Sequence, residues 1–420
     1  MKLYGGYSKK AKKNRTGAPK QKKQKRKRTG LDRFVSVLMT LVVLEGLYCT
    51  AVFSDISFIA KYRKMWIQTA MSTATHHWLA TAFIPSVVID EVMAEVSAAK
   101  QAQIGVNTNW DVETAEPEET DPELSPAELE FYNLYWEIDR DSMNAYLETH
   151  PEAITKGWDK IYINEAGLDD KGTSIQTTMG EQVLAIDVQN KTLVVRVEGS
   201  GYRGALVIAK DPSKLSVYPA QNLGSYGENV GSIAERNNGL VSMTASGFID
   251  PEGTGNGGLL TGYSMMQGEP YQGKPYVWGY KRLEIHDDDR FYITDTSNEV
   301  GAGTRDAVEF TPALIVDGKI LVDENNDWNG INPRACIGQS SRGEVLMLAI
   351  EGRLTTSLGT GVAECARILE RHDCMQAMNL DGGTSAILWY DGEYIIRCCN
   401  QSIPQGRLLP NAFVYERTAN

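Results

Sequence analysis

Hydrophobic and polar residues follow different patterns in different parts of the chain, and the first clear pattern is one long apolar run. Residues 34–54 contain a single charged residue, Glu45. A helix of about 20 apolar residues crosses a bilayer, so the run predicts a transmembrane anchor. The alternative is a cleaved signal peptide, whose apolar region is typically about 7–15 residues long and ends at a small-residue cleavage site. The length of the run and the lack of such a site in the sequence favour the anchor.

The next segment, residues 55–110, is apolar but interrupted by polar residues. Its pattern predicts two helices, over 65–83 and 86–98, separated at Pro85 because proline cannot continue a helix. These juxtamembrane helices are expected to lie near the membrane or to dock on the main domain. Residues 111–130 then hold nine acidic residues and three prolines, a composition typical of a solvated acidic linker.

From residue 131 to residue 420, short apolar stretches alternate with turn residues, which is typical of strands. Asp317–Gly318 and Asp391–Gly392 each lie between two apolar stretches and predict hairpins. Residues 344–352 read as a continuous apolar strand in the centre of a sheet, and residues 361–372 have the apolar spacing of a helix. The chain is therefore predicted to have a mixed α/β (α+β) fold, with a largely antiparallel sheet and flanking helices after one N-terminal transmembrane helix.

Charge divides the chain where hydropathy does. The 420 residues carry a formal net charge of −12, yet residues 1–33 contain 14 Lys and Arg and one Asp, so the remainder carries −25. This balance excludes a basic nucleic-acid binder for the main domain. The basic tail is expected to be disordered, and the positive-inside rule places it in the cytoplasm and residues beyond 54 outside the cell, as in a single-pass cell-membrane protein. Contact of the tail with nucleic acid or anionic lipid is a second interpretation. No pattern indicates an oligomeric state.

The strongest candidate for chemistry is the segment from residue 379 to residue 385. An apolar stretch ends in the carboxylate of Asp381, and two glycines then let the backbone turn tightly. Successive N–H groups in such a turn can bind an anion, and a carboxylate beside an anion suits acid–base work on a phosphorylated substrate. The alternative is an ordinary turn that Asp381 caps. The candidate site residues in this segment are Asn379, Asp381, Gly382, Gly383, Thr384 and Ser385.

Six segments in the second half of the chain are specific in combination, although NLDGG alone would not be. They are TPALIVDGK (311–319), NPRACIGQ (332–339), GEVLMLAIEGR (343–353), GVAECARILERH (361–372), AMNLDGGTSAILWYDG (377–392) and GRLLPNAFVYE (406–416). In this order the chain resembles the phosphodiester glycosidase family. Residues 70–83 also resemble the juxtamembrane region of bacterial members that carry an N-terminal anchor. The resemblance implies a hydrolase that acts on a sugar phosphodiester.

Three positions depart from the usual pattern of that family. Thr244 stands where the family usually has Asn in an N-[AG]-[SG]-G-F stretch. Glu351 stands where the family has Asp before Gly-Arg, and Ala335 where it has Thr after Pro-Arg. If these positions contact substrate, the activity or specificity of this chain differs from that of the family, and an inactive member is one outcome.

Two carboxylates and two arginines are the candidates for catalysis and phosphate binding. Asp381 is the first choice for a catalytic carboxylate and Glu351 the second, because Glu351 ends a predicted central strand where sites of α/β sheets collect. A glycosidase generally uses two carboxyl groups, but phosphate leaves well, so one carboxylate could suffice. A salt bridge to Arg353 or Arg334 is the alternative for Glu351. Arg334 and Arg353 are the expected phosphate ligands, since the guanidinium fork matches phosphate oxygens.

A cofactor is not expected. The oxygen-rich residues 323–329 raise the question of a Ca²⁺ site, but Trp328 stands at the sixth position, where a calcium loop needs Gly. Arg334 stands at the twelfth position in place of Glu. The segment is therefore interpreted as a polar loop, with Ca²⁺ as the alternative, and no residue is assigned as a metal ligand.

These patterns together predict a membrane-anchored, extracytoplasmic phosphodiester glycosidase. Its expected substrate is a carbohydrate with a sugar-1-phosphodiester linkage, in a cell-surface or exopolysaccharide glycan. The alternative is a non-catalytic glycan- or cell-wall-binding protein on the same fold, which the departures at Thr244 and Glu351 leave open.

Overall fold

A computed structural model describes residues 29–73, 75–110, 121–169, 171–273, 279–323 and 330–419, in two compact units, 1–54 and 55–420. Most of the basic tail, half of the acidic linker and most of the oxygen-rich loop lie outside the described residues, and so do the expectations placed on them. The first unit holds helix α1, Gly30–Phe53, which begins with a capping box between Thr29 and Asp32. Among the described residues, α1 alone is long and apolar enough to cross a membrane, as an anchor or as a signal sequence.

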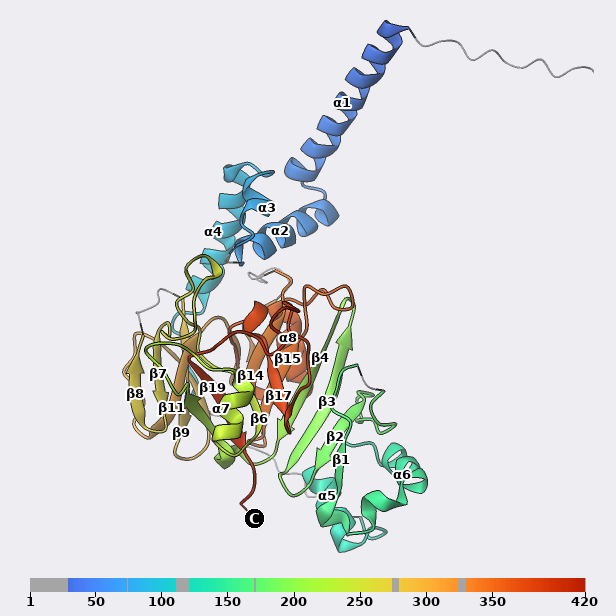
Figure 1. The fold of residues 1–420 in the computed structure, drawn as a ribbon, viewed down its shortest axis with the longest axis vertical. Helices are drawn as coiled ribbons and strands as arrows, with labels where there is room; N and C mark the ends of the chain where they lie inside the picture. Colours follow the sequence, from blue (N-terminus) through green and yellow to red (C-terminus); the bar gives the residue numbers. More distant parts are fainter. Residues whose placement is uncertain are drawn as a thin grey trace, which may run out of the picture. The chain divides into compact units, whose positions relative to one another are not determined.

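The second unit is built from three antiparallel sheets, so the predicted mixed α/β fold with largely antiparallel pairing is confirmed (Figure 1). The largest sheet has nine strands in the order β1-β2-β3-β4-β15-β14-β16-β12-β13. Their bounds are β1 Tyr162–Asn164, β2 Val183–Asp187, β3 Thr192–Gly199, β4 Tyr202–Ala209, β12 Ala313–Val316, β13 Lys319–Ile320, β14 Arg334–Ser340, β15 Val345–Ile350 and β16 Cys374–Asn379. The predicted central strand is β15, which pairs with β4 and β14.

Two five-stranded sheets complete the second unit. One has the order β10-β9-β11-β7-β8 and the other β18-β17-β6-β19-β5. The bounds in the first are β7 Tyr263–Met266, β8 Glu269–Gln272, β9 Lys281–His286, β10 Phe291–Asp295 and β11 Thr304–Phe310. Those in the second are β5 Leu215–Pro219, β6 Gly239–Thr244, β17 Leu388–Tyr390, β18 Glu393–Tyr394 and β19 Asn411–Glu416.

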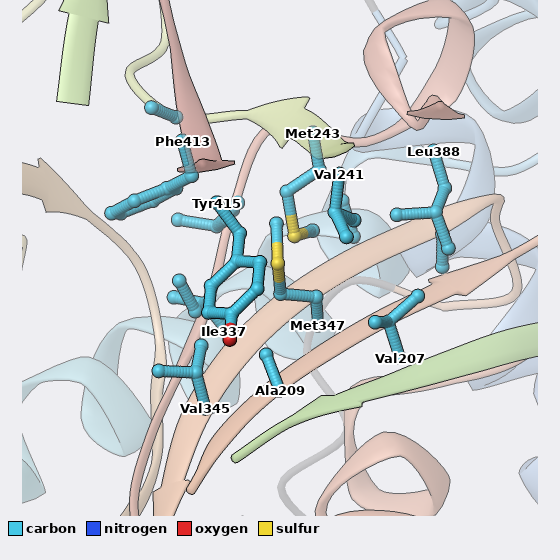
Figure 2. Packing of buried hydrophobic residues seen from close by; sticks show 14 of the residues in the cluster. Val207, Ala209, Val241, Met243, Ile337, Val345, Met347, Leu388, Phe413 and Tyr415 are labelled. Carbon is cyan, nitrogen blue, oxygen red and sulfur yellow. The ribbon is translucent and has the colours of Figure 1, made fainter. Parts of the chain in front are cut away.

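The core lies on both faces of the nine-stranded sheet. Figure 2 shows Val207 and Met347 of this sheet facing Met243 and Phe413 of the sheet that contains β6 and β19, and all four side chains are buried in one cluster. The opposite face packs against helix α8, Val362–Arg371. Because both faces are covered, its central strands are continuous apolar runs and do not alternate with polar residues.

The remaining helices lie before and between the strands. The helix and 3₁₀ bounds are α2 Ser57–Met71, α3 Trp78–Thr81, α4 Ser86–Ala102, α5 Pro126–Leu134, α6 Arg140–Thr149, α7 Val230–Arg236, η1 Pro151–Ile154, η2 Trp158–Lys160, η3 Pro212–Lys214, η4 Pro251–Gly253 and η5 Gly383–Ser385. Helix α4 starts directly after Pro85, as predicted, but the first juxtamembrane helix begins at Ser57 and ends at Met71. Helix α5 crosses the predicted boundary at residue 131, because Ser125 and Glu128 form its capping box.

The juxtamembrane helices pack on the body of the second unit. The side chain of Gln103 exchanges two hydrogen bonds with the backbone of Ala313, at 2.9 and 3.2 Å. The ammonium group of Lys281 donates to the carbonyl oxygens of Gln103 and Val106 and pairs with Asp295 at 2.7 Å. Lys281 is 2% exposed, so this is a buried charge that residues 103–106 help to satisfy. The helices are thus part of the fold of the body.

Candidate active site

A cleft of about 1230 Å³ lies at the end of β16, and almost all of the predicted site residues line it. Its walls come from the loops after β6, β15 and β16, from the segment that leads into β14, and from the turn between α2 and α3. The predicted residues that it brings together are Arg334, Arg353, Asn379, Asp381, Gly382, Gly383, Thr384 and Ser385. Glu351 does not line the cleft.

Strand β16 places Asp381 at the cleft, and the backbone after it requires glycine at the next two positions. The buried strand ends at Asn379, and the amide of Leu380 still donates to the carbonyl of Ala335 at 2.8 Å. A Cβ atom on Gly382 would stand 2.7 Å from the carbonyl oxygen of Pro333, which is backbone and cannot move aside cheaply. Gly383 has a φ of +60°, a conformation that side-chain residues rarely adopt. The chain therefore turns away sharply and leaves the carboxylate at the edge of the cleft.

The surroundings of Asp381 move the pKa of its carboxyl group toward neutral pH. Burial raises the pKa of Asp381 to about 6, and the nearby charge of Asp250 acts in the same direction. Hydrogen bonds from the Ser385 side chain and the Gly382 backbone, together with the charge of Arg407, oppose the rise. A carboxyl group with such a pKa can take or give a proton close to neutral pH.

The backbone turn offers a smaller anion cradle than the sequence predicts. The amide of Gly383 donates to the carbonyl of Pro333 at 3.3 Å, and the amide of Ser385 donates to the carbonyl of Gly382 at 3.0 Å. These two N–H groups are used within the fold. Anion binding at this end of the cleft therefore depends mainly on side chains.

The two predicted phosphate ligands have different surroundings. Arg353 is exposed, and a Cβ atom on Gly383 would stand 3.3 Å from its Nη1, so the guanidinium borders the glycine turn. It also donates to Oδ1 of Asn332 at 2.6 Å. Arg334 is buried and donates to the carbonyls of Thr360 and Gly330, at 3.0 and 2.5 Å. Arg353 is thus placed for a ligand, whereas the Arg334 side chain, which also lines the cleft, is engaged with the backbone of two loops.

Glu351 lies apart from the carboxylate that it was expected to assist. Its side chain is buried, with Oε2 2.7 Å from Nε of Arg203, and its Oε1 accepts from the backbone N–H of Arg397 at 2.7 Å. The expected alternative was a salt bridge to Arg353 or Arg334, but the partners are Arg203 and Arg397. A buried carboxylate held in this way ties β4 and β15 to the segment around Arg397, and its catalytic role remains a prediction without support from this geometry.

A second carboxylate in the cleft, Asp250, was missed. It forms a two-pronged ion pair with Arg407 and accepts from the amide of Gly255 at 2.7 Å. Burial alone would raise the pKa of Asp250, but the hydrogen bonds from Arg407 and Gly255 and the Arg407 charge outweigh it and lower the pKa. The sequence held only a weak indication of this pair, because Arg407 lies inside the last segment that resembles the family. In the structure, the Arg407 guanidinium lies 4.5 Å from the centre of the Phe248 ring, two residues before Asp250.

Cys399 also lines the cleft and lies beside Arg353. A hydrogen bond with the neighbouring thiol of Cys398 and the charge of Arg353 lower the pKa of Cys399 to about 7, against the effect of burial. Cys398 is buried, and both cysteines are free thiols. A half-exposed thiol in such surroundings is more reactive than an ordinary buried cysteine.

The turn between α2 and α3 forms a wall of the cleft that lies far from the other walls in sequence. Nδ2 of Asn332 donates to Oγ of Ser72 at 3.0 Å, which fixes the turn to one side of the cleft. A Cβ atom on Gly253 would stand 3.0 Å from Cγ2 of Thr75, which brings the turn to the loop of Asp250 on another side. The lining residues of this turn are Met71, Ser72, Thr73, Thr75, His76 and His77.

The three departures from the family pattern lie behind the cleft. Thr244, Ala335 and Glu351 are all buried, and none of them lines it. They therefore do not remove a ligand from the cleft wall.

Comparison with known families matches the part of the chain that holds most of the cleft. Residues 233–416 match the model of a family described as phosphodiester glycosidase. This part of the chain is similar to that family over 184 of the 420 residues. The match includes Asp250, Arg353, Asp381 and Arg407, whereas the wall formed by residues 71–77 lies outside it. The family acts on phosphodiester glycosides, so a glycosidase-type hydrolase is supported at this coarse level.

Individual relatives are distant. The SPbeta prophage-derived uncharacterized protein YomE of Bacillus subtilis strain 168 is 28% identical over 180 residues, which are 40% of this chain and 27% of that protein. The chain thus spans about a quarter of the length of this curated relative.

Solved structures also match the chain at low identity. The catalytic domain of zebrafish N-acetylglucosamine-1-phosphodiester alpha-N-acetylglucosaminidase, auto-inhibited by its pro-peptide, has 16% identity and a TM-score of 0.44 over 54% of this chain and 82% of that one. A hypothetical protein from Synechocystis has 15% identity and a TM-score of 0.40, over 57% and 65% of the two chains. A protein of Burkholderia pseudomallei K96243 described as a putative exported protein has 15% identity and a TM-score of 0.37, over 51% and 74%.

Proposed function

We propose that this protein is a membrane-anchored, extracytoplasmic hydrolase that releases a sugar from a sugar-1-phosphodiester in a cell-surface or exopolysaccharide glycan. The observation that carries the proposal is Asp381, whose pKa is raised to about 6 at the edge of a cleft that Arg353 also lines. Both residues lie in the part of the chain that matches the phosphodiester glycosidase family. A proton-transfer group and a cationic phosphate ligand in one cleft are what such a reaction requires.

Arg353 binds the phosphodiester in this mechanism, and Asp381 acts as the general base. At pH 7 a carboxyl group with a pKa of about 6 is mostly ionised. Asp381 takes a proton from water as the water oxygen attacks the anomeric carbon of the sugar. The bond between that carbon and the phosphate oxygen breaks, and its electron pair stays on the departing phosphate. Because phosphate leaves well, a second carboxyl group is not needed as an acid.

The pair of Asp250 and Arg407 shapes the electrostatics of this base. Asp250 is held ionised, and its negative charge raises the pKa of Asp381, while Arg407 lowers it. Two carboxyl groups whose pKa values are moved in opposite directions have different roles. Asp381 moves the proton, and Asp250 positions Arg407 and fixes the local field.

Membrane attachment and orientation complete the proposal. Helix α1 serves as the anchor, and the 14 Lys and Arg among residues 1–33 keep the N-terminus in the cytoplasm. The domain that follows then faces the outside, where cell-surface glycans are accessible.

The test uses the full chain, purified in detergent, with α-N-acetylglucosaminyl-1-phosphodiesters and a panel of related sugar-1-phosphodiesters. Release of free sugar that Asp381→Asn abolishes supports the proposal. In ¹⁸O-labelled water, label in the sugar supports attack at carbon, and label in the phosphate contradicts it. Tight binding of the panel without any release of sugar would identify a glycan-binding protein instead.

A further inference from the structure

Helix α2 carries an outward stripe of aromatic side chains. Phe58, Tyr62 and Trp66 follow at every fourth position, which places them on one face of the helix. They are 70%, 50% and 51% exposed, and the rings of Phe58 and Tyr62 lie 4.7 Å apart. The buried residues Ile67 and Gln68 lie on the other side of α2. Soluble surfaces rarely present several large aromatic residues together without a partner.

Exposed apolar side chains continue on the helices that follow. The indole N–H of Trp66 donates to the carbonyl of Leu79 at 3.1 Å, so α3 lies directly beside the stripe. On α3, in the connection to α4 and at the start of α4, large side chains are more than half exposed. We call the whole set the aromatic face: Phe58, Tyr62, Trp66, Trp78, Phe83 and Val87.

Chain connectivity and charge identify the partner of this face. Only residues 54–56 separate the end of α1 from the start of α2, and three residues reach no more than about 11 Å. If α1 spans the bilayer, α2 starts at the bilayer surface. Helix α2 contains three basic residues and no acidic one, and one of the three, Lys64, pairs with Glu95 of α4. A basic helix suits anionic lipid headgroups. Trp and Tyr are enriched where protein meets the membrane–water interface.

We propose that the aromatic face lies in the membrane–water interface and seats the catalytic cleft on the bilayer surface. The cleft wall is part of the same segment: Met71 ends the helix that carries Trp66, and His77 directly precedes Trp78. If Trp66 and Trp78 lie in the membrane–water interface, this wall of the cleft therefore lies beside the lipid headgroups.

The position of the cleft at the bilayer surface also indicates which sugar phosphodiesters can be substrates, an inference that rests on the proposed function. Met71, Met93 and Val96 give the wall formed by the juxtamembrane helices an apolar part. A sugar-1-phosphodiester whose phosphate is esterified to a lipid presents the sugar and phosphate to the cleft and an apolar chain to this wall. The substrate is accordingly a membrane-borne glycosyl phosphate.

The docking part is tested by tryptophan fluorescence of the full chain in phosphatidylcholine–phosphatidylglycerol vesicles that contain brominated lipids. Bromine quenches only tryptophans that it nearly touches. We expect quenching of the wild type, and the loss of most of it in Trp66→Phe/Trp78→Phe. The matched control is Trp158→Phe, whose ring packs against Phe131 and Tyr132, and its quenching should equal that of the wild type. Equal quenching in all three proteins overturns the docking.

The substrate part is tested by kinetics with polar replacements of the stripe, Phe58→Ser, Tyr62→Ser and Trp66→Ser together. We expect KM for a lipid-linked sugar phosphodiester in vesicles to rise at least about tenfold, the equivalent of about 1.4 kcal/mol, with no change for a soluble analogue. Tyr226→Ser is the control, since Tyr226 is 53% exposed, lies outside helices α2–α4 and does not line the cleft. Melting temperatures verify that the variants fold.

The outcomes of the two experiments distinguish the membrane docking from the proposed substrate and function. Equal KM changes for the lipid-linked and soluble substrates overturn the membrane-borne substrate. If no substrate is hydrolysed but Trp66 and Trp78 are quenched, the docking stands and the proposed function fails. If bromolipids do not quench, and the serine variant instead converts a dimer into a monomer, the aromatic face is an interface between copies and the proposal is overturned.

Discussion

Replacing Asp381 by Asn removes one proton-transfer group and nearly preserves the shape of the side chain. If Asp381 is the general base, turnover should fall by about 10²–10⁴. Glu351→Gln is the matched control, because Glu351 is a buried carboxylate outside the cleft. That variant should keep its turnover and lose stability, because Arg203 and Arg397 lose the negative charge with which they pair.

Asp381→Asn should also make the folded protein more stable. The sign of this effect and its pH range follow from the pKa of Asp381. Asp381 has a pKa of about 6 in the folded chain and an ordinary value of 3.8. Between these values the folded chain holds a proton that the unfolded chain has released, so the free energy of unfolding falls as the pH rises. About two pKa units correspond to at most about 3 kcal/mol. Water in the cleft and an imperfect fit of the amide to its hydrogen-bond donors reduce the expected gain of Asp381→Asn to about 1–2 kcal/mol.

The assay is thermal unfolding of wild type and variant, run beside the activity measurement. At about pH 7 the variant should melt a few degrees higher, and below about pH 3 the two proteins should melt together, since Asp381 is then protonated in both states. The activity of the wild type should rise with pH through about 6 as Asp381 ionises. Turnover of the variant within about threefold of wild type, far short of the loss of a general base, would refute the reasoning. So would a lower melting temperature for the variant at pH 7.

Three further predictions concern the neighbours of Asp381. Arg353→Gln should raise KM by about tenfold or more, the loss of one charge-assisted hydrogen bond, and change kcat little; steady-state kinetics over a range of substrate concentrations check it. Gly382→Ala should lower the free energy of unfolding by about 1–3 kcal/mol, because its Cβ meets the Pro333 carbonyl; denaturant titration checks it, and an unchanged midpoint would contradict it. Iodoacetamide should modify Cys399 with a rate that rises through about pH 7, and a sugar phosphodiester should protect it, as peptide mass spectrometry can show.

The parts of the fold that depend on neighbouring residues were predictable from the sequence. Asp317–Gly318 and Asp391–Gly392 were expected at hairpin tips, and they join β12 to β13 and β17 to β18. All four residues have positive φ, as the two-residue hairpin turn requires. The apolar run before Asp381 likewise identified β16 and the place where it ends. In each case the deciding interactions lie within a few residues of the signal.

What escaped prediction depends on contacts between distant residues. Glu351 was expected beside Asp381, or alternatively in a salt bridge to Arg353 or Arg334. Arg353 has a φ of +55° and its side chain turns to Asn332, while Glu351 faces Arg203. Asp250 became recognisable only through Arg407, 157 residues away. Neither composition nor periodicity contains information about such pairs.

The cleft includes residues from both sides of the acidic linker, so a boundary predicted from composition does not mark the boundary of the site. The acidic linker separates the juxtamembrane helices from the body in sequence, yet the amide of Ile331 donates to Oγ1 of Thr69 at 3.0 Å, and Gln103 bonds twice to Ala313. The region of the family match supplies Asp381, Arg353 and the floor of the cleft, and residues 71–73 and 75–77 supply a wall. Under the proposed function, Asp381 and Arg353 act on the sugar phosphate, and this wall contacts the rest of the substrate. We therefore expect differences in substrate among proteins similar to the matched region to arise in the segment that forms the wall.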